Sequence, residues 1–308
     1  MKWLTTRRIS TFTDKPYAGN PAWVVTGADK TESEKKLIKL ASELNPLSDT
    51  VFVFPEKEGV DVSLRFFSQL EEISFSGHGT IAAYLGVEGE SFFKLTEPIT
   101  LVRQKTKAGV QHIELRVKEK KIQRVTVSLP QPQFISVPLD IKQIARSLSI
   151  PPVNIIDSKF PLGVVALSGS TDIIVPVDNC DTLLNITPNF PLMKSYCDRF
   201  HMTGVVVYCF ETMEKDNTAH MRHFAPAVGI NEDPVSGAAS AGLGCYFIQN
   251  RIVPIEETTR IIIEQGYAMQ RPGKVYVHVH TLKNQIMKVT FGGQGIVTFE
   301  GRTMLPDE

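Results

Sequence analysis

The feature that most constrains this chain is a succession of segments that occurs once in each half of the sequence. Each copy has an apolar run, then a second run with the pattern Arg-x-Phe, and then a Ser-Gly turn followed by small residues. The first copy covers residues 48–83 and the second covers residues 202–242. A true repeat predicts two related lobes, each with one small-residue helix that starts at a Ser-Gly turn. Coincidence between two ordinary strand–helix units is the alternative.

Apolar residues with period two dominate much of the remaining chain. They are clearest across residues 100–129 and 261–299, where they predict antiparallel strands. The sequence has neither a strict alternation of strands and helices nor the pattern of a long helical bundle, so we expect an α+β fold. Helices are predicted at residues 32–44, 79–85, 141–147 and 237–247.

The composition excludes several classes of protein. The 308 residues include 33 Lys and Arg and 33 Asp and Glu, and this balance argues against a nucleic-acid binder that neutralises phosphates. No apolar run reaches the roughly 18 residues that a membrane-spanning helix needs, and the N-terminus lacks the apolar core of a secretory signal. The four cysteines form no Cys-x-x-Cys pair. We therefore expect a cytoplasmic protein with reduced thiols and with no membrane or nucleic-acid partner.

The two Ser-Gly turns are candidate binding sites. A helix start presents free backbone N–H groups and the positive end of the helix dipole, which bind carboxylates and oxyanions. His78 lies in the first turn, Asp233 leads into the second, and Asp49 starts a strand in the first half. Such groups can move a proton next to a carbonyl while the helix starts stabilise an enolate-like intermediate. Taken singly, each residue also fits a structural role as a hydrogen-bonding His or a turn Asp.

Four segments of the chain resemble the PhzF-like (phenazine biosynthesis-like) family, within the diaminopimelate epimerase superfamily. They occur in the family's order over nearly the whole length, and a weaker tail near residues 264–272 and 292–293 also fits. The matching segments are residues 12–22, residues 47–53, Gly77-His78-Gly79-Thr80, and residues 224–238 from Phe-Ala-Pro to Glu-Asp-Pro-Val-Ser-Gly-Ala.

The resemblance implies a diaminopimelate epimerase-like fold with two pseudo-symmetric lobes. Each lobe would be a β-barrel-like sheet around a central helix, with the site between the lobes. The N-terminal lobe is expected at residues 1–128, with strands at about 288–304 returning to it, and the C-terminal lobe at residues 129–287. Pro130 and Pro132 mark the same boundary in the sequence. The resemblance also implies a homodimer.

The activity that the resemblance implies is a proton-transfer isomerisation that uses neither a metal nor an organic cofactor. The family's best-understood substrate is a dihydro-hydroxyanthranilate, so a small-molecule carboxylate is the expected partner. Asp49 stands where the family usually has a catalytic Glu, and His78 and Asp233 match its Gly-His and Asp-Pro pairs. These three residues are the candidate catalytic groups. The candidate substrate-binding residues are Asn20, Ser76, Gly77, Gly79, Thr80, Ser236, Gly237 and Ala238.

Departures from the family pattern keep a second class of function open. Asp49 is one methylene shorter than Glu, and Ala238 replaces a Ser that some members carry. A catalytically impaired metabolite-binding or scaffold protein that retains the fold is therefore the alternative.

Two other mechanisms are weighed against the sequence. The superfamily's amino-acid epimerases use one thiol at each central-helix turn, whereas this chain has Ser76 and Ser236 there. A two-thiol mechanism is not expected, because a hydroxyl lacks the tunable pKa of a thiol. Cys245 lies further along the second helix, where apolar packing is expected. His278 and His280 share one strand face, and without a third ligand a solvent-facing strand is favoured over a metal pair.

Overall fold

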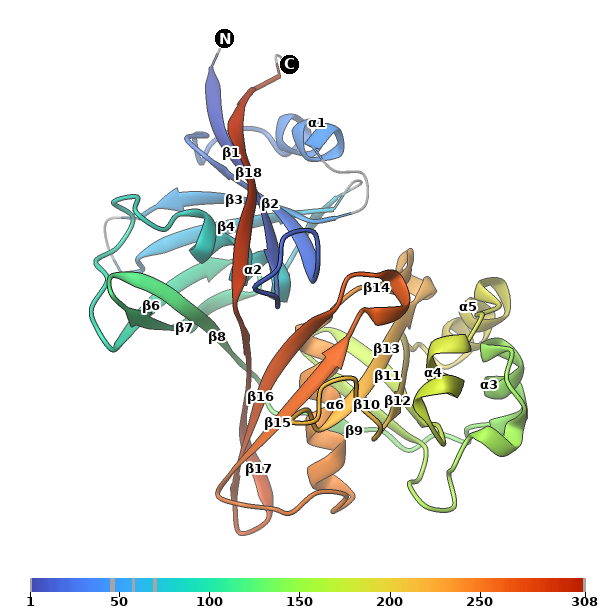
Figure 1. Ribbon diagram of the computed structural model, residues 1–308. Helices are drawn as coiled ribbons and strands as arrows, with labels where there is room; N and C mark the ends of the chain where they lie inside the picture. Colours follow the sequence, from blue (N-terminus) through green and yellow to red (C-terminus); the bar gives the residue numbers. More distant parts are fainter. Residues whose placement is uncertain (1, 45–47, 57–58, 69–70, 307–308) are drawn as a thin grey trace. The chain divides into compact units, whose positions relative to one another are not determined.

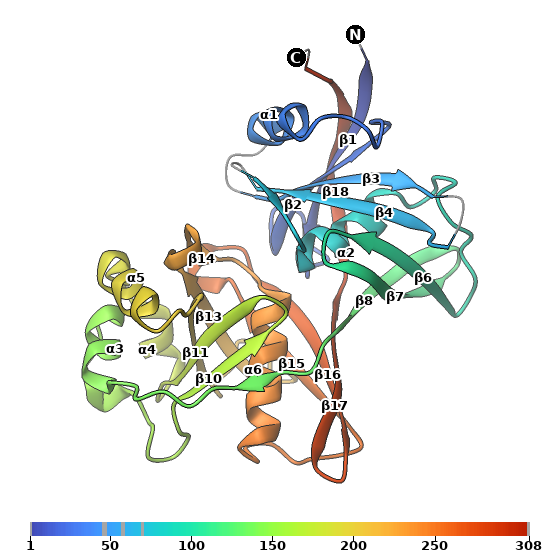
Figure 2. The same ribbon diagram turned by 180° about the vertical axis from the view of Figure 1, so that it is seen from behind.

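The computed structural model describes residues 2–44, 48–56, 59–68 and 71–306. Leu47, in the second matching segment, lies outside the described residues. The chain divides into two compact units (Figures 1 and 2). The first unit comprises Met1–Ser128 and Gly292–Glu308, and the second comprises Leu129–Phe291. The chain therefore leaves the first unit once and returns to it.

The first unit consists of a curved set of strands with two helices. Its C-terminal strand, β18, pairs antiparallel with β1, so segments from the two ends of the chain lie side by side (Figure 1). The elements are β1 (Trp3–Thr11), β2 (Asn20–Thr26), α1 (Glu34–Leu44), β3 (Thr50–Pro55), β4 (Val62–Phe67), β5 (Glu72–Ile73), α2 (Gly77–Gly86), β6 (Ile99–Thr106), β7 (Gly109–Lys118), β8 (Lys121–Leu129) and β18 (Gly295–Met304).

The second unit has the same kind of strand framework and more helices. Three short 3-10 turns, Pro152–Asn154, Pro226–Val228 and Tyr267–Met269, connect its elements. The elements are β9 (Gln133–Phe134), α3 (Ile141–Leu148), β10 (Gly163–Leu167), β11 (Ser170–Pro176), α4 (Cys180–Asn185), α5 (Phe190–Arg199), β12 (Gly204–Cys209), β13 (Ala219–Ala225), β14 (Ile230–Asp233), α6 (Gly237–Gln249), β15 (Thr258–Gln265), β16 (Gly273–Leu282) and β17 (Gln285–Gly293).

Strand pairing follows the same order in both units. In the first, β1–β2 is antiparallel, β2–β3 parallel, β3–β4 antiparallel, β4–β6 parallel and β6–β7 antiparallel. In the second, β10–β11, β11–β12, β12–β13, β13–β15 and β15–β16 repeat that alternation. The internal repeat is therefore confirmed, and so is the α+β class of the fold.

A buried helix occupies the middle of each unit. Residues 79–86 of α2 are all buried, and so are eleven residues of α6. A helix that is apolar on every side requires burial on every side. Close packing explains the small residues: a Cβ on Gly86 would lie 2.9 Å from Val24, and a Cβ on Gly244 would lie 2.9 Å from Val277. Strands thus approach both helices more closely than side chains would allow.

Other helices cover the outer face of each strand framework. Leu37, Leu40 and Ala41 of α1 pack on Phe52 and Phe67, as the apolar face of segment 32–44 predicts. In the second unit α3, α4 and α5 gather along β11–β13 and bury a separate core (Figures 1 and 2). Sequence periodicity misses α4 and α5, although Asn179 and Asn189 cap their first turns.

The Arg-x-Phe pattern has the same structure in both units. Arg65 forms two hydrogen bonds with the Glu72 carboxylate, and Arg222 forms two with that of Glu232. The guanidinium carbon of Arg65 lies 5.2 Å from the Phe67 ring centroid, and that of Arg222 lies 4.9 Å from the Phe224 ring. Arg222 also donates to three backbone carbonyls at the end of α4, those of Leu183, Leu184 and Ile186. Each arginine thereby ties a strand to the outer layer of its unit.

Candidate active site

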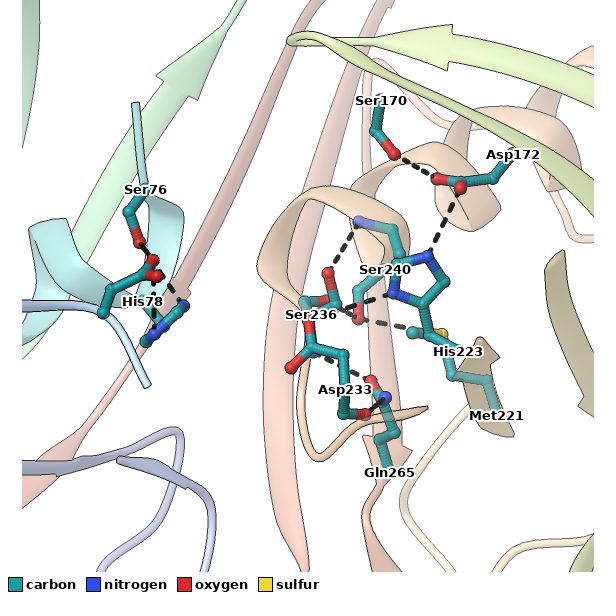
Figure 3. A network of polar contacts seen from close by, with 12 residues as sticks. Ser76, His78, Ser170, Asp172, Met221, His223, Asp233, Ser236, Ser240 and Gln265 are labelled. Atoms are coloured by element: carbon teal, nitrogen blue, oxygen red, sulfur yellow. Dashed lines mark hydrogen bonds and ion pairs between the residues drawn. The ribbon is translucent and has the colours of Figure 1, made fainter. Parts of the chain in front are cut away.

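Asp49, Ser76 and His78 meet at the start of α2, and we call them the first-unit cluster. Figure 3 labels Ser76 and His78 of this cluster. The Ser76 hydroxyl donates to Asp49 Oδ2 at 2.5 Å. His78 Nε2 lies 3.6 Å from the same carboxylate oxygen, and His78 Nδ1 lies 3.4 Å from Ser76 Oγ. The side chains of Asp49 and His78 are 20% and 18% exposed. The Asp49 carboxylate is therefore hydrogen-bonded to Ser76 and lies at ion-pair distance from His78, and both side chains are partly exposed.

Strand register and a helix cap hold the first-unit cluster in place. The Trp23 amide donates to the Asp49 carbonyl at 3.0 Å, and the Ser48 hydroxyl donates to the Pro21 carbonyl. These bonds fix the residue before β3 against β2. Ser76 is the N-cap of α2, and its Oγ accepts a hydrogen bond from the Gly79 amide at 3.1 Å. One hydroxyl thus both caps the helix and orients the Asp49 carboxylate.

The accessible part of the α2 start is its first two residues. Gly77 and His78 are partly exposed, whereas Gly79 and Thr80 are buried. The Thr80 side chain is fully buried, and its hydroxyl donates to the Ser76 carbonyl. This bond completes the first turn of the helix. A substrate-binding role for Thr80 stays a prediction.

Asp233 lies at the end of β14, just before the start of α6. The Gln265 side-chain amide donates to the Asp233 carbonyl, and its oxygen accepts a hydrogen bond from the Ser236 amide at 2.9 Å. Ser236 caps α6 by accepting from the Ala239 amide at 3.4 Å. The side chain of Asp233 is 17% exposed. This arrangement places a carboxylate beside a helix start in the second unit as well.

A buried histidine adjoins Asp233, and sequence reasoning missed it. His223 Nδ1 lies 3.9 Å from Asp233 Oδ2, and His223 Nε2 lies 3.3 Å from Asp172 Oδ1 (Figure 3). Burial by itself lowers the pKa of His223, but attraction to Asp172 and then to Asp233 outweighs it and raises the pKa to about 10. We call Asp172, His223 and Asp233 the second-unit triad. Both neighbouring carboxylates therefore favour the protonated form of the imidazole.

The remaining candidate binding residues lie at strand or helix starts. Asn20 begins β2 and is buried, and its carbonyl accepts the Thr11 hydroxyl at 2.8 Å. Gly237 is buried, and a Cβ there would lie 2.4 Å from the Phe291 ring. Ala238 is partly exposed in the first turn of α6. Ala238 is thus the residue of Ser236, Gly237 and Ala238 that is partly exposed.

Cys245 and the paired histidines are not members of these clusters. Cys245 is fully buried in α6, and burial raises the pKa of its thiol to about 12, as expected for a packing role. His278 and His280 share the partly exposed face of β16, and the Thr258 hydroxyl lies 2.9 Å from His280 Nδ1. Within the described ranges, no group of three His, Cys, Asp or Glu side chains could hold a metal ion. Among the same residues, no helix is long and apolar enough to cross a membrane.

Comparison with known proteins assigns the chain to a family. Residues 9–301 match the model of the family described as phenazine biosynthesis-like protein, so the chain belongs to that family. A crystal structure of the PhzF-family phenazine biosynthesis protein from Bacillus anthracis has a TM-score of 0.88 and 26% identity, and the match covers 99% of this chain and 100% of that one. The fold is diaminopimelate epimerase-like, and solved epimerase and racemase structures share it at 17% identity or less.

Curated relatives give the class of reaction. A protein of Clostridium acetobutylicum named an uncharacterized isomerase is 29% identical over 97% of both chains. The trans-2,3-dihydro-3-hydroxyanthranilate isomerase of Pseudomonas aeruginosa is 24% identical, over 96% of this chain and 98% of that one. The chain is accordingly an isomerase of the phenazine biosynthesis-like family.

Proposed function

We propose that this isomerase moves a proton within a small carboxylate-bearing metabolite, with Asp49 as the principal acid and base and with no cofactor. The observation that carries the proposal is the first-unit cluster, in which a partly exposed carboxylate is held by Ser76 and lies beside His78 at the start of α2. Isomerase relatives that match nearly the full length support the reaction class.

The proposed reaction has two proton transfers. In the first, Asp49 takes a proton from a carbon of the substrate, and the C–H electron pair becomes part of a new C=C bond as an enolate-like intermediate forms. In the second, the protonated Asp49 returns the proton to a different carbon, and the double bond shifts. The sum is an isomerisation with no net oxidation or reduction, and general acid–base catalysis of this kind contributes about 10² to 10⁴ in rate.

Helix starts and the other titratable groups serve the same reaction in this proposal. Backbone N–H groups at the start of α2, where Gly77 is partly exposed, are suited to bind a substrate carboxylate or an intermediate oxyanion. His78, beside Asp49, orients the substrate or relays the proton. Asp233 provides a second carboxylate, and Gln265 holds the backbone there by bridging the Asp233 carbonyl and the Ser236 amide.

The shorter side chain at position 49 is compatible with this role. The Asp49 carboxylate already reaches both Ser76 and His78. We therefore propose that the substrate approaches the start of α2 more deeply here than in relatives that carry Glu.

The test uses purified protein, the compound trans-2,3-dihydro-3-hydroxyanthranilate, and any metabolite released when the purified protein is denatured. We expect the wild-type protein to isomerise at least one of these compounds, and we expect Asp49→Asn to lose at least about 100-fold in kcat. Asp49→Glu is the matched control, because it keeps a carboxylate and should retain measurable turnover. An Asp49→Asn variant with full activity contradicts the assignment. Tight binding without turnover by the wild-type protein assigns the chain instead to the impaired metabolite-binding class.

A further inference from the structure

The two units differ at three equivalent positions of their inner faces. In the second unit these positions carry Asp172, His223 and Asp233. Asp172 is 4% exposed and His223 is 5% exposed, whereas Asp233 is partly exposed. All three can carry a charge, and the histidine lies between the two carboxylates. The first unit has apolar residues at the same positions: Ala22, Phe66 and Ile73.

Strand register establishes two of the equivalences. His223 is the middle residue of its Arg-x-Phe pattern and lies opposite Val206, whereas Phe66 is the middle residue of the other pattern and lies opposite Val51. Asp233 pairs with His223 across β13 and β14. In the first unit, β4 and β5 pair Phe66 with Ile73 in the same way.

The parallel strand pairs establish the third equivalence. Ile173 lies beside Val205 in the second unit, and Trp23 lies beside Thr50 in the first. The preceding residues, Asp172 and Ala22, therefore correspond. Gly204 separates Asp172 from β13 and contributes no side chain, and a Cβ there would lie 2.3 Å from the Phe224 carbonyl oxygen.

The charged triad is therefore not a requirement of this fold. The first unit closes the same strands around the same kind of helix with three apolar residues. Buried charges are expensive to remove from water, and well-packed apolar residues at such positions are often equally or more stabilising. A buried ionic triad beside the α6 start, in only one of two equivalent units, indicates a functional constraint.

We propose that Asp172 and His223 are positioning residues that hold the Asp233 side chain in place as an ionised carboxylate. This inference rests on the proposed function, because it assigns Asp233 a role in the same reaction. Asp172 Oδ1 lies 3.3 Å from His223 Nε2 and orients the ring, whereas His223 Nδ1 lies 3.9 Å from Asp233 Oδ2, the distance of an ion pair and longer than a hydrogen bond. The Ser170 hydroxyl donates to Asp172 Oδ2 at 2.7 Å and thereby orients the Asp172 carboxylate.

Charge balance around the imidazole supports this assignment. Asp172 on β11 and Asp233 on β14 face it, and together they raise the pKa of His223 to about 10 against the lowering effect of burial. Cys197 on α5 also lies near Asp172, but burial raises the pKa of its thiol to about 12, so it is neutral. A positive charge beside Asp233 favours the ionised form of that carboxylate. Asp233 then acts as a hydrogen-bond acceptor toward substrate, and the exchangeable proton belongs to Asp49.

Nuclear magnetic resonance tests the charge states without any ligand. Imidazole ¹⁵N and carboxyl ¹³C shifts are followed against pH in the wild-type protein, Asp172→Asn and His223→Gln. We expect His223 to be doubly protonated at pH 7 and to lose its proton at a pH lower by at least about one unit in Asp172→Asn. We also expect Asp233 to become harder to ionise in His223→Gln. A neutral His223 at pH 7, or an Asp233 titration that His223→Gln does not change, overturns the proposal.

A double variant that copies residues of the first unit separates positioning from folding. Asp172→Ala/His223→Phe gives the second unit the residues that the first unit has at those positions, so we expect it to fold. Its kcat with trans-2,3-dihydro-3-hydroxyanthranilate, or with the co-purified metabolite if that compound is inert, should fall at least about tenfold, with a changed pH profile. A folded double variant with wild-type kcat and pH profile overturns the catalytic part of the proposal. Failure of the Asp49 assignment gives a different pattern, in which Asp49→Asn is active while the His223 titration is as expected.

Discussion

At the scale of single residues, the Ser76 hydroxyl links the fold to the chemistry. It accepts a hydrogen bond from the Gly79 amide and donates one to Asp49. A hydrogen bond to a charged group is worth roughly 1.5–3 kcal/mol, more than a neutral one. Ser76 therefore contributes both to helix stability and to the orientation of the Asp49 carboxylate.

Ser76→Ala should affect both properties. We expect a loss of about 1 kcal/mol in the free energy of unfolding from the missing cap, and a fall of about tenfold or more in kcat. Asp140→Ala is the matched control, because Asp140 caps α3 through the Lys142 and Gln143 amides and is remote in sequence from the first-unit cluster. Urea unfolding and steady-state kinetics measure the two effects. Equal kcat values for both variants would show that the Ser76 hydroxyl has only a structural role.

The charge on His223 predicts how stability depends on pH. Its pKa in the folded protein, about 10, lies above its ordinary value of 6.5. The contribution to stability is therefore fully present below about pH 6.5 and is lost as pH rises through 10. We expect urea unfolding to show a loss of a few kcal/mol between pH 7 and pH 10 that is smaller in Asp172→Ala/His223→Phe. The same loss in both proteins would show that His223 is not the group responsible.

At the scale of elements, sequence patterns predicted most strands and the two central helices. The Ser-Gly turns and small residues were sufficient because they mark a cap followed by a helix that must be buried. The second-unit triad was not predictable in this way. Asp172, His223 and Asp233 are far apart in sequence, and only the register of β11, β13 and β14 brings them together. Likewise α4 has only 6 residues, and the caps of α4 and α5 are weak signals without the core that these helices cover.

Close packing around α6 gives a prediction with an internal control. A Cβ at Gly244 would lie 2.9 Å from Val277 Cγ1 and 3.4 Å from Ile261, whereas a Cβ at Gly242 meets nothing closer than Val165 at 3.8 Å. Gly244→Ala should destabilise the protein by roughly 1–3 kcal/mol, because the strand must move. Gly242→Ala should stabilise it by up to about 1 kcal/mol through helix propensity. Thermal unfolding distinguishes the two, and equal effects would contradict this account of the packing.

At the scale of the whole molecule, the two units differ in how the chain builds them. The second unit is continuous from Leu129 to Phe291, whereas the first needs residues 292–308 to complete it. We therefore expect a fragment of residues 129–291 to unfold cooperatively on its own. A fragment of residues 1–128 should not, because β1 would lack its partner β18. Circular dichroism during urea titration measures the unfolding of both fragments, and a cooperative 1–128 fragment would contradict the prediction.

The homodimer and the cytoplasmic location stay predictions.

In the proposed reaction, Asp49 is the residue that transfers the proton. The most direct measurement is deuterium incorporation from D₂O into the substrate, followed by mass spectrometry with wild-type protein, Asp49→Asn and Asp49→Glu. The Asp49 side chain is 20% exposed, so its acid proton can exchange with D₂O before it is delivered to the second carbon. We therefore expect incorporation at a single carbon with the wild-type protein, reduced incorporation with Asp49→Glu, and none above background with Asp49→Asn. Incorporation by Asp49→Asn at the wild-type rate would contradict it.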